Sequence, residues 1–265
     1  MITAASLAVG LVIGLSLGAL GGGGSILTVP ALVYLLGETA RVATTESLVV
    51  VGITAIVATT AHARAGHVCW GPGIAFGAAG LAASYAGTAA NTRVDPQVLL
   101  LGFAALMLAA ATAMLARRPL IATAPTSVGP VGPAAPPPVA TTDVVKVLAA
   151  GSVVGFLTGF LGVGGGFVIV PVLVMALGYT MADAVGTSLL VIAINSAAAL
   201  LARGGHAQLH WTILAPFIAA ALAGSLAGHR IAVRLPAEIL KKAFAVLLVL
   251  VAGYVAVRAG LAMAG

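Results

Sequence analysis

Residues 147–182 read VLAAGSVVGFLTGFLGVGGGFVIVPVLVMALGYTMA, and this stretch decides the fold. It contains no Asp, Glu, Lys or Arg. A helix rises ~1.5 Å per residue and a bilayer's hydrocarbon core is ~30 Å thick, so the stretch is long enough to cross a membrane. A glycine run at 162–166 and Pro171 interrupt it, so we expect a broken membrane segment rather than one straight helix.

The whole chain has the same character. Of its 265 residues, 61% are hydrophobic and 7% are charged, whereas a soluble domain carries about 25% charged residues. Continuous apolar runs predict helices, because barrel strands alternate apolar and polar residues. The formal charge of +6 comes from scattered single Lys and Arg residues without interleaved aromatics, so we expect no nucleic-acid partner. Cys69 is the only cysteine, which excludes an intrachain disulfide.

A shift of 141 residues lays one half of the chain over the other. Gly14 then falls on Gly155, and Pro30 falls on Pro171. Aligned glycines and prolines do not follow from apolar composition alone, so we predict a duplication. The predicted organisation is a first transmembrane repeat at 1–118, a Pro/Ala-rich linker at 119–142 and a second transmembrane repeat at 143–265.

Each repeat offers about 4–5 hydrophobic segments. They are expected at 3–20, 26–37, 44–62, 71–91 and 97–116, and at 147–161, 167–178, 184–202, 211–229 and 238–258. The second segment of each repeat is short and follows a Gly-rich turn, which is typical of broken or re-entrant helices at a transporter's binding site. The predicted fold class is an all-α integral membrane protein with two homologous repeats. The chain crosses the membrane eight times if the two short segments re-enter and ten times if they span. Basic loops in both halves leave parallel and inverted repeats open.

The glycine runs are candidate anion sites. Glycine permits positive φ and leaves backbone N–H groups uncovered, and a helix N-terminus adds a positive dipole end. The alternative is that glycines let helices pack closely, which we favour for Gly14 and Gly155. For the two glycine clusters we favour a substrate-lining role. The candidates are Gly23, Gly24, Ser25, Gly164, Gly165 and Gly166.

A polar stripe follows each glycine run. Ser47 and Thr54 are seven residues apart and share a helix face, as do Ser188 and Asn195. Capping of a helix start by Thr or Ser is the alternative explanation. A stripe at the same place in both repeats favours substrate binding, so we add Thr187 to these four candidates.

Glu46 is an acid close to an apolar span, and its counterpart is Thr187. An ionisable residue inside a membrane is costly, which predicts a function such as proton coupling. The alternative is an interfacial Glu that stabilises a helix N-terminus. The five histidines show no local spacing with acids that favours a metal site, so no metal and no cofactor are expected.

These residues together resemble the sulfite exporter TauE/SafE family, also called the toluene-sulfonate uptake permease group. The resemblance rests on the glycine run before Pro30, on the run Gly155–Gly166 before Pro171, and on 186–189 with Asn195. It implies a multi-pass carrier of the cell (cytoplasmic) membrane that moves sulfite, organosulfonates or related sulfur-containing or carboxylate anions. The expected partners are the lipid bilayer, a small anionic substrate and, as an open alternative, a second copy in a homodimer.

Two other functions compete with a secondary carrier. An anion channel would use the same broken helices. An intramembrane enzyme could use Ser25 as a nucleophile with His62 as its base. No acid is placed to orient that base, so we predict that the chain is not an enzyme.

Overall fold

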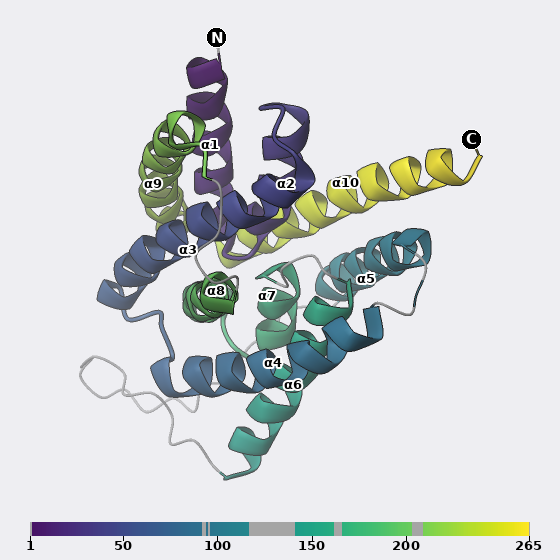
Figure 1. The fold of residues 1–265 in the computed structure, drawn as a ribbon. Helices are drawn as coiled ribbons and strands as arrows, with labels where there is room; N and C mark the ends of the chain where they lie inside the picture. Colours follow the sequence, from purple (N-terminus) through teal and green to yellow (C-terminus); the bar gives the residue numbers. More distant parts are fainter. Residues whose placement is uncertain are drawn as a thin grey trace.

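The computed structural model describes residues 2–91, 94, 96–116, 141–161, 166–202 and 209–264, and all regular structure in these ranges is helical (Figure 1). The first-half helices are α1 (Ile2–Leu20), α2 (Gly23–Tyr34), α3 (Ala40–Arg64), α4 (Trp70–Asn91) and α5 (Pro96–Ala116). The second-half helices are α6 (Thr141–Leu161), α7 (Gly166–Met175), α8 (Met181–Ala202), α9 (Trp211–Arg234) and α10 (Ala237–Ala264). The prediction of an all-α membrane fold is confirmed.

Most helices begin and end within a few residues of the predicted segments. The two short ones, α2 with 12 residues and α7 with 10, each contain the proline that the sequence places there. Gly37 and Gly178 follow these helices with φ of 77° and 71°, a left-handed conformation that favours glycine and ends a helix. Helix α6 begins two residues inside the predicted linker, and residues 117–140 lie outside the described part of the chain.

Two helix pairs, α1 with α9 and α4 with α6, pack through glycines. A Cβ added to Gly14 would overlap the backbone of Ala221, and one added to Gly155 would overlap the backbone of Gly80. Both glycines therefore allow close backbone approach, which is the packing role favoured from the sequence. The shift of 141 residues relates the Gly14–Ala221 contact to the Gly155–Gly80 contact. The same holds for Gly10–Phe217 with Gly151–Phe76, and for Gly18–Ser225 with Gly159–Ser84.

Three further contacts join a helix to its own counterpart: α3 packs on α8, α5 on α10, and α2 on α7. Helix α3 also packs on α9, and α4 on α8, which is again an equivalent pair of contacts. In Figure 1, α7 and α8 lie between the α1–α9 pair and the α4–α6 pair. This packing is what two equivalent halves arranged about a two-fold axis would give. Common descent of the halves remains a prediction from the sequence.

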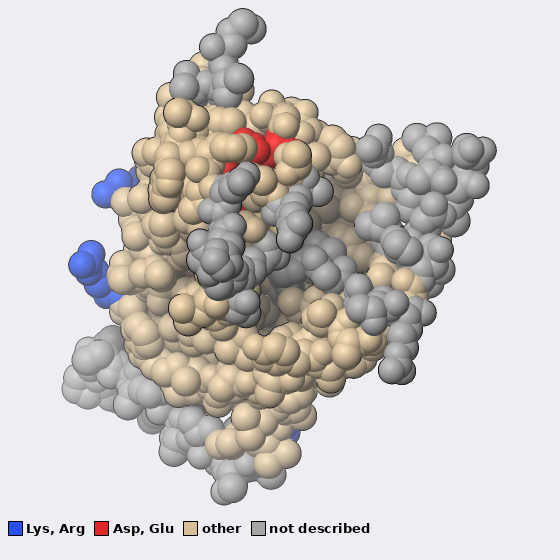
Figure 2. Space-filling model, viewed as in Figure 1, with Lys and Arg blue, Asp and Glu red and all other residues tan. Residues whose placement is uncertain are grey.

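The outer surface is apolar. Large hydrophobic side chains such as Val12, Val153 and Leu250 are about 60% exposed or more, and the face in Figure 2 shows acidic atoms at one place only, near its upper end. Within the described residues, four helices are long and apolar enough to cross a bilayer, namely Val42–Arg64, Met181–Leu201, Trp211–Arg234 and Ala237–Val257. Lipid is the solvent that such a surface requires.

Candidate functional site

Helices α2 and α7 begin against each other near the middle of the fold. A Cβ on Gly22 would overlap the backbone of Gly166, and a Cβ on Gly166 would lie 2.6 Å from the hydroxyl of Ser25. That hydroxyl donates a 2.7 Å hydrogen bond to the carbonyl of Gly22. No side chain caps the start of α2, so the N–H groups of its first turn have no partner from a capping side chain.

Positive φ, which the sequence associates with the glycine runs, is found at only part of the first run. Among the described glycines of the first run, Gly21 alone has positive φ, 73°, and its Cα faces the hydroxyl of Ser188. Gly23 and Gly24 are helical, so the expected positive φ is wrong for them. A Cβ on Gly23 would meet a side chain of α10, and one on Gly24 would meet the backbone of α1. Gly164 and Gly165 lie outside the described residues.

Thr54 and Asn195 occupy equivalent positions on α3 and α8. The Thr54 hydroxyl and the Asn195 side-chain oxygen are buried without a hydrogen-bond partner among the described residues. A buried polar atom without a hydrogen-bond partner is rare in folded proteins and needs a physical explanation. Ser47 and Ser188 instead donate to carbonyls one turn earlier, at 3.1 and 2.8 Å. Within the predicted polar stripe, Thr54 and Asn195 are therefore the members with unsatisfied atoms.

Glu46 and Thr187 make equivalent hydrogen bonds across the two halves. Glu46 Oε1 accepts from the backbone N–H of His210 at 2.9 Å, and Thr187 Oγ1 accepts from that of Cys69 at 3.1 Å. Each donor immediately precedes a helix, α9 or α4. Glu46 is fully buried within the protein. It does bind a helix N-terminus, but that of α9 rather than its own.

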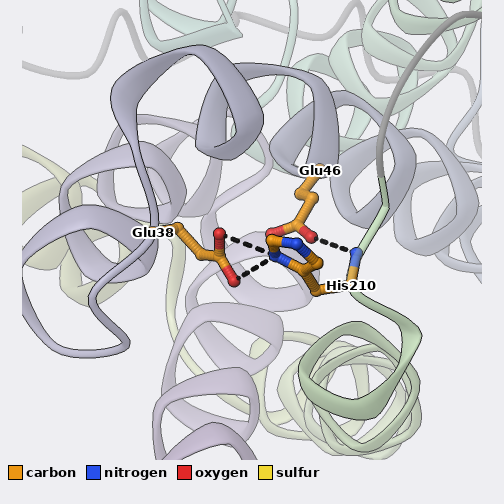
Figure 3. A group of neighbouring side chains, drawn as sticks. All are labelled: Glu38, Glu46 and His210. Carbon is orange, nitrogen blue, oxygen red and sulfur yellow. Dashed lines mark hydrogen bonds and ion pairs between the residues drawn. The ribbon is translucent and has the colours of Figure 1, made fainter.

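Glu38 completes a cluster with Glu46 and His210 (Figure 3). The two Glu38 carboxylate oxygens lie 2.8 and 2.9 Å from His210 Nδ1, and this hydrogen bond raises the pKa of His210. The second oxygen of Glu46 is buried with no partner among the described residues. Sequence reasoning missed Glu38 and His210, because the partners are 172 residues apart. One available signal was that Glu38 ends the charge-free stretch at the N-terminus.

The equivalent cluster, which the 141-residue shift relates to this one, has three neutral residues in place of the two acids and the histidine. The shift of 141 residues maps Glu38 on Tyr179, Glu46 on Thr187 and His210 on Cys69. Burial raises the pKa of the Cys69 thiol, which lies beside the side chains of Thr187 and Tyr179. An ion pair of His67 with Asp183, 2.9 Å long and about one-third exposed, lies beside it.

Two further histidines meet near a cavity of about 140 Å³. The rings of His62 and His229 are 4.3 Å apart between centroids, and both Nδ1 atoms are buried without a partner among the described residues. His62 Nε2 lies 3.1 Å from the carbonyl of Gly18. The hydroxyl of Ser25 bonds Gly22 instead, so the described contacts do not join the nucleophile and base that an enzyme would pair.

The fold and these buried polar groups define a multi-pass membrane protein with two equivalent sets of helices in contact. The chain belongs to the TauE/SafE family, since the sequence model described as Sulfite exporter TauE/SafE matches residues 6–255. Two proteins of Xylella fastidiosa, from strains Temecula1 and 9a5c, are each named a probable membrane transporter protein. Each is 35% identical over 246 residues, which cover 92% of this chain and 90% of the relative. No solved structure matches the chain. The protein is thus a membrane transporter.

Proposed function

We propose that the protein is a secondary carrier for a small anion, of which sulfite, an organosulfonate or a related sulfur-containing or carboxylate anion is the best candidate. The observation that carries the proposal is the uncapped start of α2, packed against the start of α7 at Gly22 and Gly166. Sulfite is the substrate in the family's description. The other anions follow from the same chemistry, a small oxyanion that accepts several hydrogen bonds.

The partial positive charges of backbone N–H groups can bind a small oxyanion. The first N–H groups of a helix and its dipole attract an anion without a fixed cation. No Lys or Arg is among the buried residues that the structure describes. In a low dielectric, hydrogen bonds from these N–H groups to an oxyanion are stronger than in water. Ser25, Ser188, Thr187 and Ser47 lie on the elements that meet here, with Gly164 and Gly165 proposed for the matching turn.

Thr54 and Asn195 are the side chains that we propose to donate hydrogen bonds to the anion. Their unsatisfied atoms lie on α3 and α8, the two long helices that pack on each other. An anion between the halves would accept from the Thr54 hydroxyl and from the Asn195 side-chain NH₂ group, whereas the unsatisfied Asn195 Oδ1 is itself an acceptor and would need a different partner. The glycine-rich contacts of α1 with α9 and α4 with α6 would then let one part of the fold rock against the other around the bound anion.

Coupling to a cation is assigned to Glu46. It is buried, while the His210 side chain beside it is about half exposed. A cation, in the simplest case a proton, can reach the carboxylate from water through His210. This assignment rests on burial and contact alone, and the anion site does not depend on it.

The proposal is tested by anion binding to the purified protein. Sulfite, thiosulfate, a short alkylsulfonate and acetate are compared by the shift in thermal unfolding, because a ligand that binds only the folded state stabilises it. At least one of the sulfur anions should stabilise the wild type. Thr54→Val should weaken that stabilisation, whereas Thr112→Val should not, since Thr112 is an exposed hydroxyl bonded to its own helix. Equal shifts in both variants would exclude Thr54 from the site.

A further inference from the structure

The proposed coupling residue Glu46 belongs to a cluster with Glu38 and His210. Glu38 lies in the connection from α2 to α3, Glu46 in the second turn of α3, and His210 immediately before α9. One ligand atom from each lies within 4.8 Å of the other two. Figure 3 shows both carboxylates directed toward the His210 ring and backbone. Tertiary packing therefore brings together two oxygens and one nitrogen that can face one ion.

The burial of the two carboxylates needs an explanation. Glu38 is 7% exposed and Glu46 is 0% exposed, and acids are rarely buried unless they are paired or coordinate a metal. Among the described residues, His210 is the only positive partner of either carboxylate. The buried second oxygen of Glu46 still has no partner within the described chain.

The neutral cluster of Tyr179, Thr187 and Cys69, at the equivalent position, shows that packing alone does not require these acids. Thr187 binds the N–H before α4 in the way that Glu46 binds the N–H before α9. Tyr179 and Cys69 take the places of Glu38 and His210 without any charge. Since the same helix contacts form from neutral groups, the two acids in one half serve a different purpose.

We propose that Glu38, Glu46 and His210 bind one divalent transition-metal ion, of the kind represented by Mn²⁺ or Zn²⁺. Two carboxylates and one imidazole suit these ions, which take oxygen and nitrogen ligands together. The dication neutralises both carboxylates and gives the unpaired Glu46 oxygen a partner. His210 Nδ1 exchanges its contact with Glu38 for the metal and loses its proton. The exposed side of His210 provides the access route and leaves room for water ligands.

This site departs from the expectation of no metal, which rested on local spacing of histidines. Its three ligands come from segments up to 172 residues apart, so no local spacing could reveal it. The inference does not depend on anion transport. The metal test below contains no anion substrate, so a failure of the metal site and a failure of the proposed carrier are distinguishable.

The test is metal binding to the full chain. Protein purified in detergent is stripped with a chelator, equilibrated with Mn²⁺ or Zn²⁺ in excess Mg²⁺, and separated from free metal. The retained metal is then measured by elemental analysis. Wild type should retain about one ion per chain. Glu46→Gln and Glu38→Gln should each bind about tenfold or more weakly, the scale on which disturbed metal sites lose affinity. The amide oxygen that Glu46→Gln introduces can still accept from the His210 N–H, which favours a folded variant.

Asp183→Asn is the matched control, because it removes a carboxylate that contacts a histidine in the other half. It should retain the ion at wild-type affinity. Size-exclusion chromatography checks that each variant is folded, and His210→Gln replaces either glutamate variant that is not. The proposal is overturned if wild type retains no ion, which would leave a proton to neutralise Glu46. It is also overturned if folded ligand variants bind as tightly as wild type.

Discussion

Helices α4 and α9 begin in the same place in their respective halves and are held there by different chemistry. At α4 a neutral hydroxyl of Thr187 accepts from the chain, with Cys69 and Tyr179 beside it. At α9 a buried carboxylate does the same, with a second carboxylate and a histidine beside it. The comparison separates two tasks: the hydrogen bond positions the helix in both halves, and the charge is added in one half alone. Where equivalent frameworks differ in charge, function is the better explanation for the difference.

The largest expected loss of stability tests whether the α1–α9 and α4–α6 contacts are equivalent. Gly14→Leu and Gly155→Leu should each destabilise the fold by about 3 kcal/mol or more, because the added side chain meets backbone that cannot move without separating two helices. The measurement is thermal unfolding with size-exclusion chromatography. Gly253→Leu is the control, since a Cβ there meets nothing within 4 Å. A large loss in only one half would show that the two interfaces are not equivalent.

The next largest effect tests whether a metal ion stabilises the protein through Glu46. With metal at about 100 times its Kd, the wild type should gain about 2.7 kcal/mol of unfolding free energy, and Glu46→Gln should gain almost none. With a chelator present, the variant should be at least as stable as the wild type, because it removes a buried carboxylate oxygen without a partner. Unfolding curves with and without Mn²⁺ measure both. A variant that gains as much as the wild type would contradict the assignment of Glu46.

A smaller loss of stability is expected in the neutral cluster of Thr187, Cys69 and Tyr179. Thr187→Val should lower the unfolding free energy by about 1–2 kcal/mol, since the N–H of Cys69 loses its acceptor while the volume of the side chain is nearly unchanged. Metal should not alter that loss. If the loss depended on metal, the two clusters would be coupled rather than independent.

The smallest effect concerns the partly exposed pair of His67 with Asp183. Asp183→Asn should change the unfolding free energy by less than about 1 kcal/mol, because water screens a pair whose side chains are 35% and 31% exposed. Increasing salt should reduce the difference from wild type. A loss comparable to that of Thr187→Val would mean that this pair also positions α4.

Sequence patterning predicts the helices well and the contacts between distant segments poorly. Charge-free runs predict the helix positions, and Pro30 and Pro171 after glycines predict the short α2 and α7. The glycine at position 14 is correctly assigned to packing, because small residues at spacing four form a flat helix face. The expected positive φ of Gly23 and Gly24 is wrong, since α2 begins earlier than its apolar run.

The polar clusters are harder to predict because their partners come together only through tertiary packing. Glu38 and His210 share no local motif, and neither do His67 and Asp183. Glu46 stands out in the sequence as an acid beside an apolar span, but nothing there indicates that it binds the start of α9. The polar stripe predicts Thr54 and Asn195, and their unsatisfied atoms can be recognised only with the surrounding helices in place.

The most direct test of the account is counter-flow exchange of sulfite in proteoliposomes. A carrier with one anion site between two halves should accumulate labelled sulfite when the vesicles are preloaded with unlabelled sulfite. Thr54→Val and Asn195→Leu should each lower that exchange at equal protein insertion, and Thr112→Val should not. Sulfite, a short alkylsulfonate and acetate compete in the same assay. Uncoupled flow without counter-flow accumulation would indicate a channel, and wild-type exchange in both site variants would contradict the proposed anion site.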